Sequence, residues 1–306
     1  MTDCSDYNIS RNFFAHYHQI GDENGHPLTN VYWSKAPREM PVFGSVYFIH
    51  GYGGSPVEPC LKLPMQYALS HGFNVIAIEG ADLSATATPQ KNISAMTLER
   101  QKRALDTGLQ FCEKLEPLNR DYKVAWIHSI SCRAMSDLMI DSPKIRHYFN
   151  EMVLNNPYFL PPPKVCMLRE KMYKRDPSGQ TWDILVHKVT TQIREIENRR
   201  FTIPTCLYNL SIPLPHKWEQ KPQFEDLARR VSFFVKNIRL HFILGTEDNM
   251  ADYQQNLQIF RGLDIPNKQI ISIKGANHSF DNSPNLYMEF SGMVLDAIKS
   301  RCVNVK

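Results

Sequence analysis

The sequence of 306 residues lacks several patterns that would each indicate a particular class of protein. Its seven cysteines are odd in number and form no C-x-x-C pair, which is typical of a reducing compartment and provides no metal-ligand spacing. No apolar run approaches the roughly 18 residues of a membrane-spanning helix, and the polar first ten residues contain no apolar signal segment. We therefore expect a cytoplasmic protein without a transmembrane segment, for which peripheral membrane contact stays open.

Nucleotide and nucleic acid binding are also poorly supported. The glycine-rich turn at 51–54 is followed by no Lys-Ser or Lys-Thr pair, and the chain contains no G-x-G-x-x-G motif. The net charge of +4 is too small to indicate a nucleic acid partner. Residues 160–236 hold 14 Lys and Arg against 8 Asp and Glu, and the simplest interpretation of this excess is a solvated helical surface.

The composition and the order of apolar runs predict an α/β protein. Apolar residues make up 42% of the chain and charged residues 22%, a balance that can form a full globular core. Apolar runs of strand length alternate with amphipathic stretches, which predicts βα units around a mainly parallel sheet. Buried strands are expected at 45–50, 74–79, 123–128, 151–155, 239–245 and 269–274. Two antiparallel strands at 12–20 and 28–34, joined by an Asn-Gly turn, precede them, and helices are expected at 94–116, 253–263 and 283–300.

The alternation is interrupted after Pro157. Helix-like stretches at 164–173 and 182–200 are followed by a proline-rich segment at 204–222. We therefore expect a core formed by residues 1–156 and 236–306, with a helical cap, or lid, inserted at 157–235.

Three residue types that acyl-transfer chemistry needs each follow a predicted strand. Ser129 follows VAWIH, Asp248 follows HFILG, and His278 follows IISIK. A hydroxyl is a poor nucleophile at neutral pH unless a neutral imidazole accepts its proton, and a buried carboxylate must hold that imidazole in the correct tautomer. We therefore expect these three side chains to converge from their strand ends as a catalytic triad.

Alternatives to two of these assignments stay open. Ser129 is also suited to be the N-cap of the helix that follows it. Glu247 and Asp252 are close enough in sequence to replace Asp248 as the acid.

The surroundings of Ser129 depart from the usual nucleophile elbow, G-x-S-x-G. Ile127 and Ser131 stand where that motif has glycine, so Ile127 needs a smaller neighbour in the sharp turn. This departure raises the question of weakened activity. His128 is expected to shape the elbow.

The turn Gly51-Tyr52-Gly53-Gly54 is the expected oxyanion loop. Glycine permits the positive φ angles and the close approach that such a loop needs. The expected donors are the backbone N–H groups of Tyr52 and Ile130. His50 and Gly51 are expected to contact the substrate, and His50 also to support the loop through hydrogen bonds.

In order and spacing, these motifs resemble the α/β-hydrolase superfamily, specifically its lid-bearing esterase, lipase and lysophospholipase-like branch. The resemblance rests on His50-Gly51 with Gly53-Gly54, on His128-Ser129, and on the strand ends at 245–248 and 275–278. It implies an eight-stranded, mostly parallel sheet whose second strand is antiparallel, with a cap after the sixth strand. It also implies an acyl-enzyme on Ser129 that water hydrolyses with the help of His278, and neither a metal nor an organic cofactor.

The substrate class is argued from the cap. Apolar cap residues can cover an acyl chain, although such residues more often pack in a core, and basic residues such as Arg199 and Arg200 can contact an anionic head group. We expect a serine hydrolase of carboxylic esters, with an acyl ester or lysophospholipid-like molecule as substrate. An acyl thioesterase and a catalytically weak hydrolase-fold binding protein are the alternatives.

Overall fold

A computed structural model describes most of the chain outside the middle insertion. The described residues are 13–51, 56–80, 98–115, 121–159 and 238–304 without 249, together with 168, 171–172, 174–178, 180–181, 184–185 and 188. Within this part of the chain, no helix is both long enough and apolar enough to cross a membrane.

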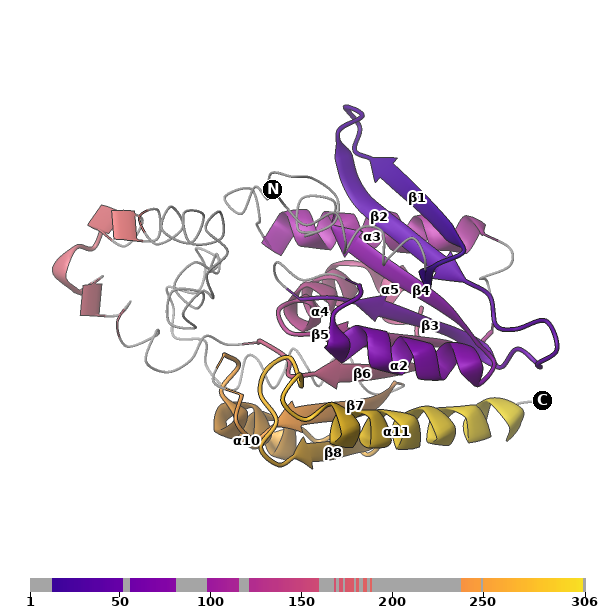
Figure 1. Ribbon diagram of the computed structural model, residues 1–306. Helices are drawn as coiled ribbons and strands as arrows, with labels where there is room; N and C mark the ends of the chain where they lie inside the picture. The colour runs from indigo at the N-terminus through magenta and orange to yellow at the C-terminus, as the bar shows by residue number, and fades with distance from the viewer. Residues whose placement is uncertain are drawn as a thin grey trace.

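The described residues contain one eight-stranded sheet in the order β1-β2-β4-β3-β5-β6-β7-β8 (Figure 1). Its strands are β1 (His16–Gly21), β2 (Pro27–Ser34), β3 (Gly44–Ile49), β4 (Phe73–Gly80), β5 (Lys123–His128), β6 (Glu151–Asn155), β7 (Arg239–Gly245) and β8 (Lys268–Ile273). The second strand, β2, is antiparallel to both of its neighbours, and every pair from β4 to β8 is parallel. The mostly parallel sheet expected from the sequence is therefore confirmed.

Helices cover both faces of the sheet, as Figure 1 shows. On one face lie α2 (Pro59–Ser70) and α11 (Pro284–Asn304), and on the other lie α3 (Leu98–Lys114), α4 (Ser131–Asp141) and α10 (Tyr253–Gly262). The short helix α5 (Pro143–Arg146) follows α4. Strands covered on both sides are apolar throughout rather than alternating, which explains the continuous apolar runs of β3, β4 and β5.

Alternate residues of the central strands supply two separate cores. Trp126 of β5 packs with Phe48 of β3 on the side of α2 and α11, and their ring centroids lie 5.9 Å apart. Its chain neighbours Ala125 and Ile127 belong to the core on the side of α3 and α4. Because successive side chains of a strand point to opposite faces, one short segment anchors both layers.

Most expected elements agree with the structure to within two residues. The first strand is a larger deviation, because β1 begins at His16 rather than at residue 12, and residue 12 lies outside the described part. Residues 94–97 of the expected helix also lie outside it, and α3 begins at Leu98. The helix α2 had no predicted range, and Pro64 stands inside it.

The insertion lies between β6 and β7, where the sequence places the cap. Nearly all of 160–237 falls outside the described residues. The division into a core and a cap at 157–235 therefore stays a prediction.

Candidate active site

Ser129 occupies a sharp turn between β5 and α4. Its φ of +58° is a left-handed conformation that side-chain-bearing residues rarely adopt, at a cost of roughly 1–3 kcal/mol. Neighbouring backbone holds the turn in place, because the Ser129 N–H donates to the Asn155 carbonyl at 3.0 Å and the Ser129 carbonyl accepts from the Tyr158 N–H at 3.0 Å. The turn lifts the hydroxyl clear of the strand, and the side chain caps no helix in the structure, since the residue at the N-cap position of α4 is Ile130.

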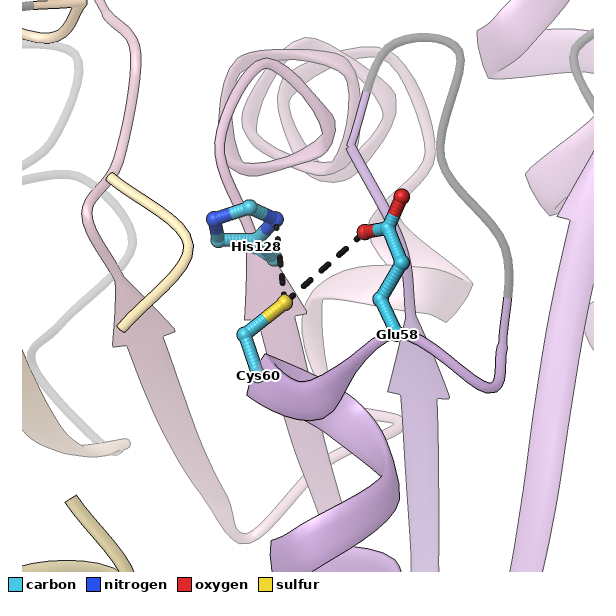
Figure 2. A group of neighbouring side chains, drawn as sticks. All are labelled: Glu58, Cys60 and His128. Atoms are coloured by element: carbon cyan, nitrogen blue, oxygen red, sulfur yellow. Dashed lines mark hydrogen bonds between the residues drawn. The ribbon is translucent and has the colours of Figure 1, made fainter. Parts of the chain in front are cut away.

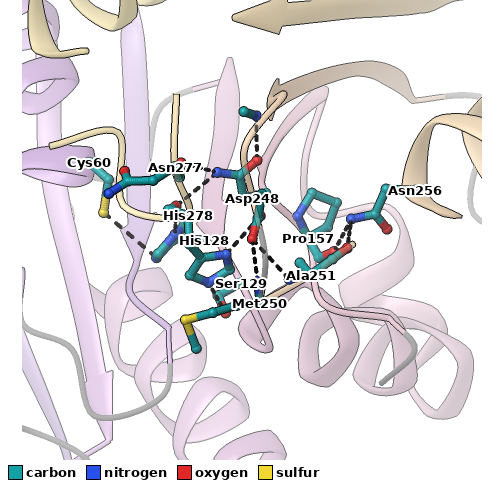
Figure 3. A network of polar contacts seen from close by, with 12 residues as sticks. Cys60, His128, Ser129, Pro157, Asp248, Met250, Ala251, Asn256, Asn277 and His278 are labelled. Carbon is teal, nitrogen blue, oxygen red and sulfur yellow. Dashed lines mark hydrogen bonds and ion pairs between the residues drawn. The ribbon is translucent and has the colours of Figure 1, made fainter. Parts of the chain in front are cut away.

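The side chains of Ser129, His278 and Asp248 form a continuous hydrogen-bonded chain (Figure 3). His278 Nε2 lies 2.8 Å from Ser129 Oγ, and His278 Nδ1 lies 2.8 Å from Asp248 Oδ2. All three residues are buried, with 5–7% of their surface exposed. The structure thus brings together the three residues that the sequence singled out.

The tautomer of His278 follows from its partners. An ionised carboxylate can only accept, so Nδ1 carries the proton that points to Asp248, and the unprotonated Nε2 accepts from the Ser129 hydroxyl. Burial alone would raise the pKa of Asp248, but His278 and the backbone N–H groups of Met250 and Ala251 together lower it. The carboxylate therefore stays ionised and accepts on both oxygens.

The structure decides between the candidate acids. Glu247 is exposed, whereas the chain of hydrogen bonds through His278 is buried. Asp252 accepts from the Gln255 N–H at 3.0 Å and so serves as the N-cap of α10. Of the three acidic residues, Asp248 is the one that is hydrogen-bonded to His278.

The turns that follow β7 and β8 are joined directly to each other. The Glu247 N–H donates to the Ala276 carbonyl at 2.9 Å, and the Gly275 N–H donates to Thr246 Oγ1 at 2.8 Å. A Cβ on Gly245 would lie 2.4 Å from the Ala276 carbonyl oxygen, so only glycine permits this approach. The acid and the imidazole are therefore placed by one compact unit of backbone.

Solved structures of known proteins share this arrangement of strands and helices. An esterase, Est1E from Butyrivibrio proteoclasticus, superposes with a TM-score of 0.57 at 13% identity, over 94% of this chain and 100% of that one. Monoglyceride lipase from Saccharomyces cerevisiae gives 0.59 at 14% identity, over 92% and 94%. Mouse alpha/beta hydrolase domain-containing protein 10 gives 0.54 at 13% identity, over 94% and 99%.

The chain has the α/β-hydrolase fold. No family model matches the sequence, and no curated protein sequence matches it either. At these identities the likeness establishes the fold, and the residues of the site have to be judged by their own geometry.

The α/β-hydrolase fold here holds the backbone of His278 through two further side chains. Asn156 Nδ2 donates to the His278 carbonyl at 2.8 Å and to the Asn277 carbonyl at 3.0 Å, while its Oδ1 accepts from the Gly245 N–H at 2.7 Å. His128 Nε2 also lies 3.0 Å from the His278 carbonyl. Asn156 was not predicted from the sequence, where its only signal was a pair of asparagines at the end of a buried strand.

One of the two expected oxyanion donors lies in the described part of the chain. Ile130 follows Ser129 and directly precedes α4. The other expected donor, Tyr52, lies outside the described residues, as do Gly53 and Gly54.

Gly51 packs directly against Ser129. A Cβ on Gly51 would lie 2.7 Å from Ser129 Cβ and 3.3 Å from Ser129 Oγ. Ser131 Oγ joins the two segments, because it donates to the His50 carbonyl and accepts from Gln101 Nε2 at 2.5 Å. Ser131, which stands in place of the second glycine of the elbow motif, therefore links the elbow by a hydrogen bond to the segment after β3 that contains Gly51.

His50 is buried at the start of the expected oxyanion loop. It is 2% exposed, and its Nδ1 lies 2.7 Å from the Gly51 carbonyl, to which it donates. Its Nε2 lies 4.0 Å from Glu79, a buried carboxylate. Substrate contacts by His50 and Gly51 stay a prediction, and Arg199 and Arg200 lie outside the described residues.

Ile127 is accommodated without exposure. Its side chain is fully buried in the core on the side of α3 and α4, in the cluster that contains the small side chains Cys132 and Ala134. A small neighbour of Ile127 is therefore present at the start of α4, where Cys132 Sγ donates to the Ile127 carbonyl at 3.5 Å.

Proposed function

We propose that this protein is a serine hydrolase of carboxylic esters that works through an acyl-enzyme on Ser129. The observation that carries the proposal is the 2.8 Å contact between His278 Nε2 and Ser129 Oγ, with Asp248 bound to the other ring nitrogen. The fold supports it, because structures that share the fold are described as an esterase and as a monoglyceride lipase.

The first half of the reaction forms the acyl-enzyme. As Ser129 Oγ attacks the ester carbonyl carbon, its proton passes to His278 Nε2, and Asp248 stabilises the resulting imidazolium. The charge that develops on the carbonyl oxygen is stabilised by the N–H groups of Ile130 and Tyr52. The imidazolium then gives its proton to the departing alkoxide, which leaves as an alcohol.

The second half returns the enzyme to its starting state. His278 Nε2 takes a proton from water, whose oxygen attacks the acyl carbon, and the carbonyl oxygen is stabilised again at the same position. Ser129 Oγ then leaves and takes this proton from the His278 imidazolium. The products are one carboxylic acid and one alcohol, and no cofactor takes part in the exchange.

The cap at 157–235 supplies the proposed substrate preference. Its apolar residues cover an acyl chain of medium or long length, and its basic excess, including Arg199 and Arg200, contacts an anionic head group. A lysophospholipid-like ester has both features.

Hydrolysis of graded esters tests this proposal. Wild-type protein is assayed with p-nitrophenyl esters and with thioesters of increasing chain length, beside Ser129→Ala and the control Ser291→Ala, which alters a buried serine of α11. We expect activity in the wild type and the control and none above background in Ser129→Ala. Equal activity in all three proteins would refute the proposal. Faster turnover of thioesters than of esters would identify the protein as a thioesterase, whose leaving group is a thiol.

A further inference from the structure

A second cluster of reactive side chains lies beside the elbow, and the proposed reaction does not use it. It consists of Glu58, Cys60 and His128, whose ligand atoms all lie within 4.8 Å of one another (Figure 2). Cys60 is fully buried and His128 is 3% exposed, while Glu58 is half-buried. Figure 2 shows the thiol between the imidazole and the carboxylate, with Glu58 and Cys60 coming from the start of α2 and His128 from the end of β5.

The tautomer of His128 leaves a nitrogen lone pair inside this cluster. His128 Nε2 lies 3.0 Å from the His278 carbonyl oxygen, which can only accept, so Nε2 carries the ring proton. In this tautomer the lone pair is on Nδ1, which lies beside the Cys60 thiol. Histidines that bind metals usually donate their other ring N–H to a carbonyl or carboxylate in this way.

The thiol of Cys60 cannot satisfy both of its neighbours. Its Sγ lies 3.7 Å from His128 Nδ1 and 3.8 Å from Glu58 Oε2, and a thiol has one proton to donate to these two acceptors. Within the described residues, Cys60 is the only hydrogen-bond partner of His128 Nδ1. Glu58 occupies the N-cap position of α2, so its carboxylate lies at the start of the helix that carries Cys60. A divalent cation in place of the thiol proton would bind lone pairs from all three groups.

Distance and charge both fit zinc. Tetrahedral Zn²⁺ with bonds of about 2.3 Å to sulfur and about 2.0 Å to nitrogen or oxygen sets its sulfur about 3.5 Å from the other ligand atoms. The observed 3.7 and 3.8 Å separations are close to that value. Thiolate and carboxylate together neutralise the two positive charges, so the loaded site adds no net charge to a buried position.

We propose that Glu58, Cys60 and His128 bind one Zn²⁺ ion, with water as the fourth ligand. The ion links the start of α2 to the end of β5, which lies one residue before Ser129. It therefore holds the start of α2, which follows the glycine-rich turn, close to the elbow. Linear spacing does not reveal such a site, because Cys60 and His128 are 68 positions apart. The proposal does not depend on ester hydrolysis.

Metal titration of the reduced full-length protein tests the proposal directly. After removal of metal with a chelator, Zn²⁺ affinity is measured by competition with a chromophoric chelator, and Co²⁺ is used as a spectroscopic substitute that shows thiolate-to-metal charge transfer. The test variants are Cys60→Ser and Glu58→Gln. Cys132→Ser is the matched control, because Cys132 is also a fully buried, free cysteine close to the elbow.

The expected outcomes separate a zinc site from nonspecific binding. Wild type and Cys132→Ser bind one Zn²⁺ per chain, show the charge-transfer band with Co²⁺, and unfold at higher temperature with Zn²⁺. Cys60→Ser loses the band and at least about tenfold in affinity. Glu58→Gln keeps the band with weaker Zn²⁺ binding. Absence of binding by wild type, or an unchanged band in Cys60→Ser, would overturn the proposal. If Cys60→Ser fails to fold, unchanged Zn²⁺ affinity in Glu58→Gln would overturn it instead.

Discussion

The side-chain amide of Asn156 donates to the backbone carbonyl of His278 at 2.8 Å. The same side chain accepts from the N–H of Gly245, three residues before Asp248, at 2.7 Å. One buried asparagine therefore connects the end of β6 to both turns that carry the imidazole and the acid. Its φ of +38° is a conformation that asparagine tolerates better than most residues, which fits its place at this corner.

Removing the donor of Asn156 should reduce turnover rather than substrate binding. Asn156→Asp keeps an oxygen that accepts from Gly245 but loses the N–H groups that hold the His278 carbonyl. We expect kcat to fall about 10- to 100-fold, because small displacements of a reacting group have effects of this size, and KM to change little. Steady-state kinetics beside the exposed control Asn267→Asp measure this, and an unchanged kcat would contradict the positioning role.

A methyl group at Gly51 should displace Ser129. In Gly51→Ala the new Cβ would meet Ser129 Cβ at 2.7 Å, far inside van der Waals contact, so Ser129 or the loop has to move. We expect a loss of kcat/KM of at least about tenfold in a protein that still folds. The control is Gly292→Ala on α11, where the new Cβ would meet only the ring of Tyr67, at 3.1 Å. Equal activity of the two variants would argue against close packing at the elbow.

Glu151 should make stability depend on pH. Burial would raise its pKa, but hydrogen bonds from His241, Arg301 and Tyr122 outweigh burial and lower the pKa from 4.5 to about 2. Because the folded pKa is the lower one, the stabilisation is fully present above pH 4.5 and is lost as the pH falls toward about 2. The shift corresponds to on the order of 3 kcal/mol.

Denaturant unfolding of Glu151→Gln at several pH values measures this contribution. Glutamine does not titrate, so the variant should be less stable than wild type at neutral pH, and the difference should shrink through the acid range. A difference that stays constant down to about pH 2 would contradict the assignment of the pKa shift to this residue.

Charge reversal in the cap should affect anionic substrates alone. For Arg199→Glu with Arg200→Glu, we expect a higher KM for esters with an anionic head group and the same KM for neutral esters, because only the former lose a charge-assisted contact. The control variant, Lys35→Glu with Arg38→Glu, changes the net charge of the protein by the same amount at positions between β2 and β3. Equal changes in KM for anionic and neutral esters would instead favour the interpretation that these arginines belong to a solvated helical surface.

Much of the core fold was predictable because each strand is both apolar and bounded by turn residues. The segment 123–128 is an example, since its expected range and the observed β5 are identical. The alternation of strands with amphipathic helices was enough to predict the mainly parallel sheet. The order of the strands was beyond such patterns, because hydrophobic periodicity contains no information on which strands are neighbours. The Asn-Gly turn predicted that the first two strands are antiparallel to each other, and only the resemblance to known folds implied that the second strand is antiparallel within the larger sheet.

The candidate site was predictable where a residue type is itself reactive. Ser129, Asp248 and His278 stood out because each follows a strand, and parallel strands end at one edge. Asn156 did not stand out, because its role depends on three backbone groups that come from distant turns. The cluster of Glu58, Cys60 and His128 was likewise invisible in the sequence, since only the fold brings the start of α2 close to the end of β5.

Covalent labelling of the nucleophile tests the central claim most directly. A fluorophosphonate reacts with a serine hydroxyl only where a neighbouring base activates it, so peptide mapping after labelling identifies the activated residue. We predict a single labelled position, Ser129, whose labelling is abolished in Ser129→Ala and retained in Ser291→Ala. Labelling at another residue, or normal labelling of Ser129→Ala, would contradict the account.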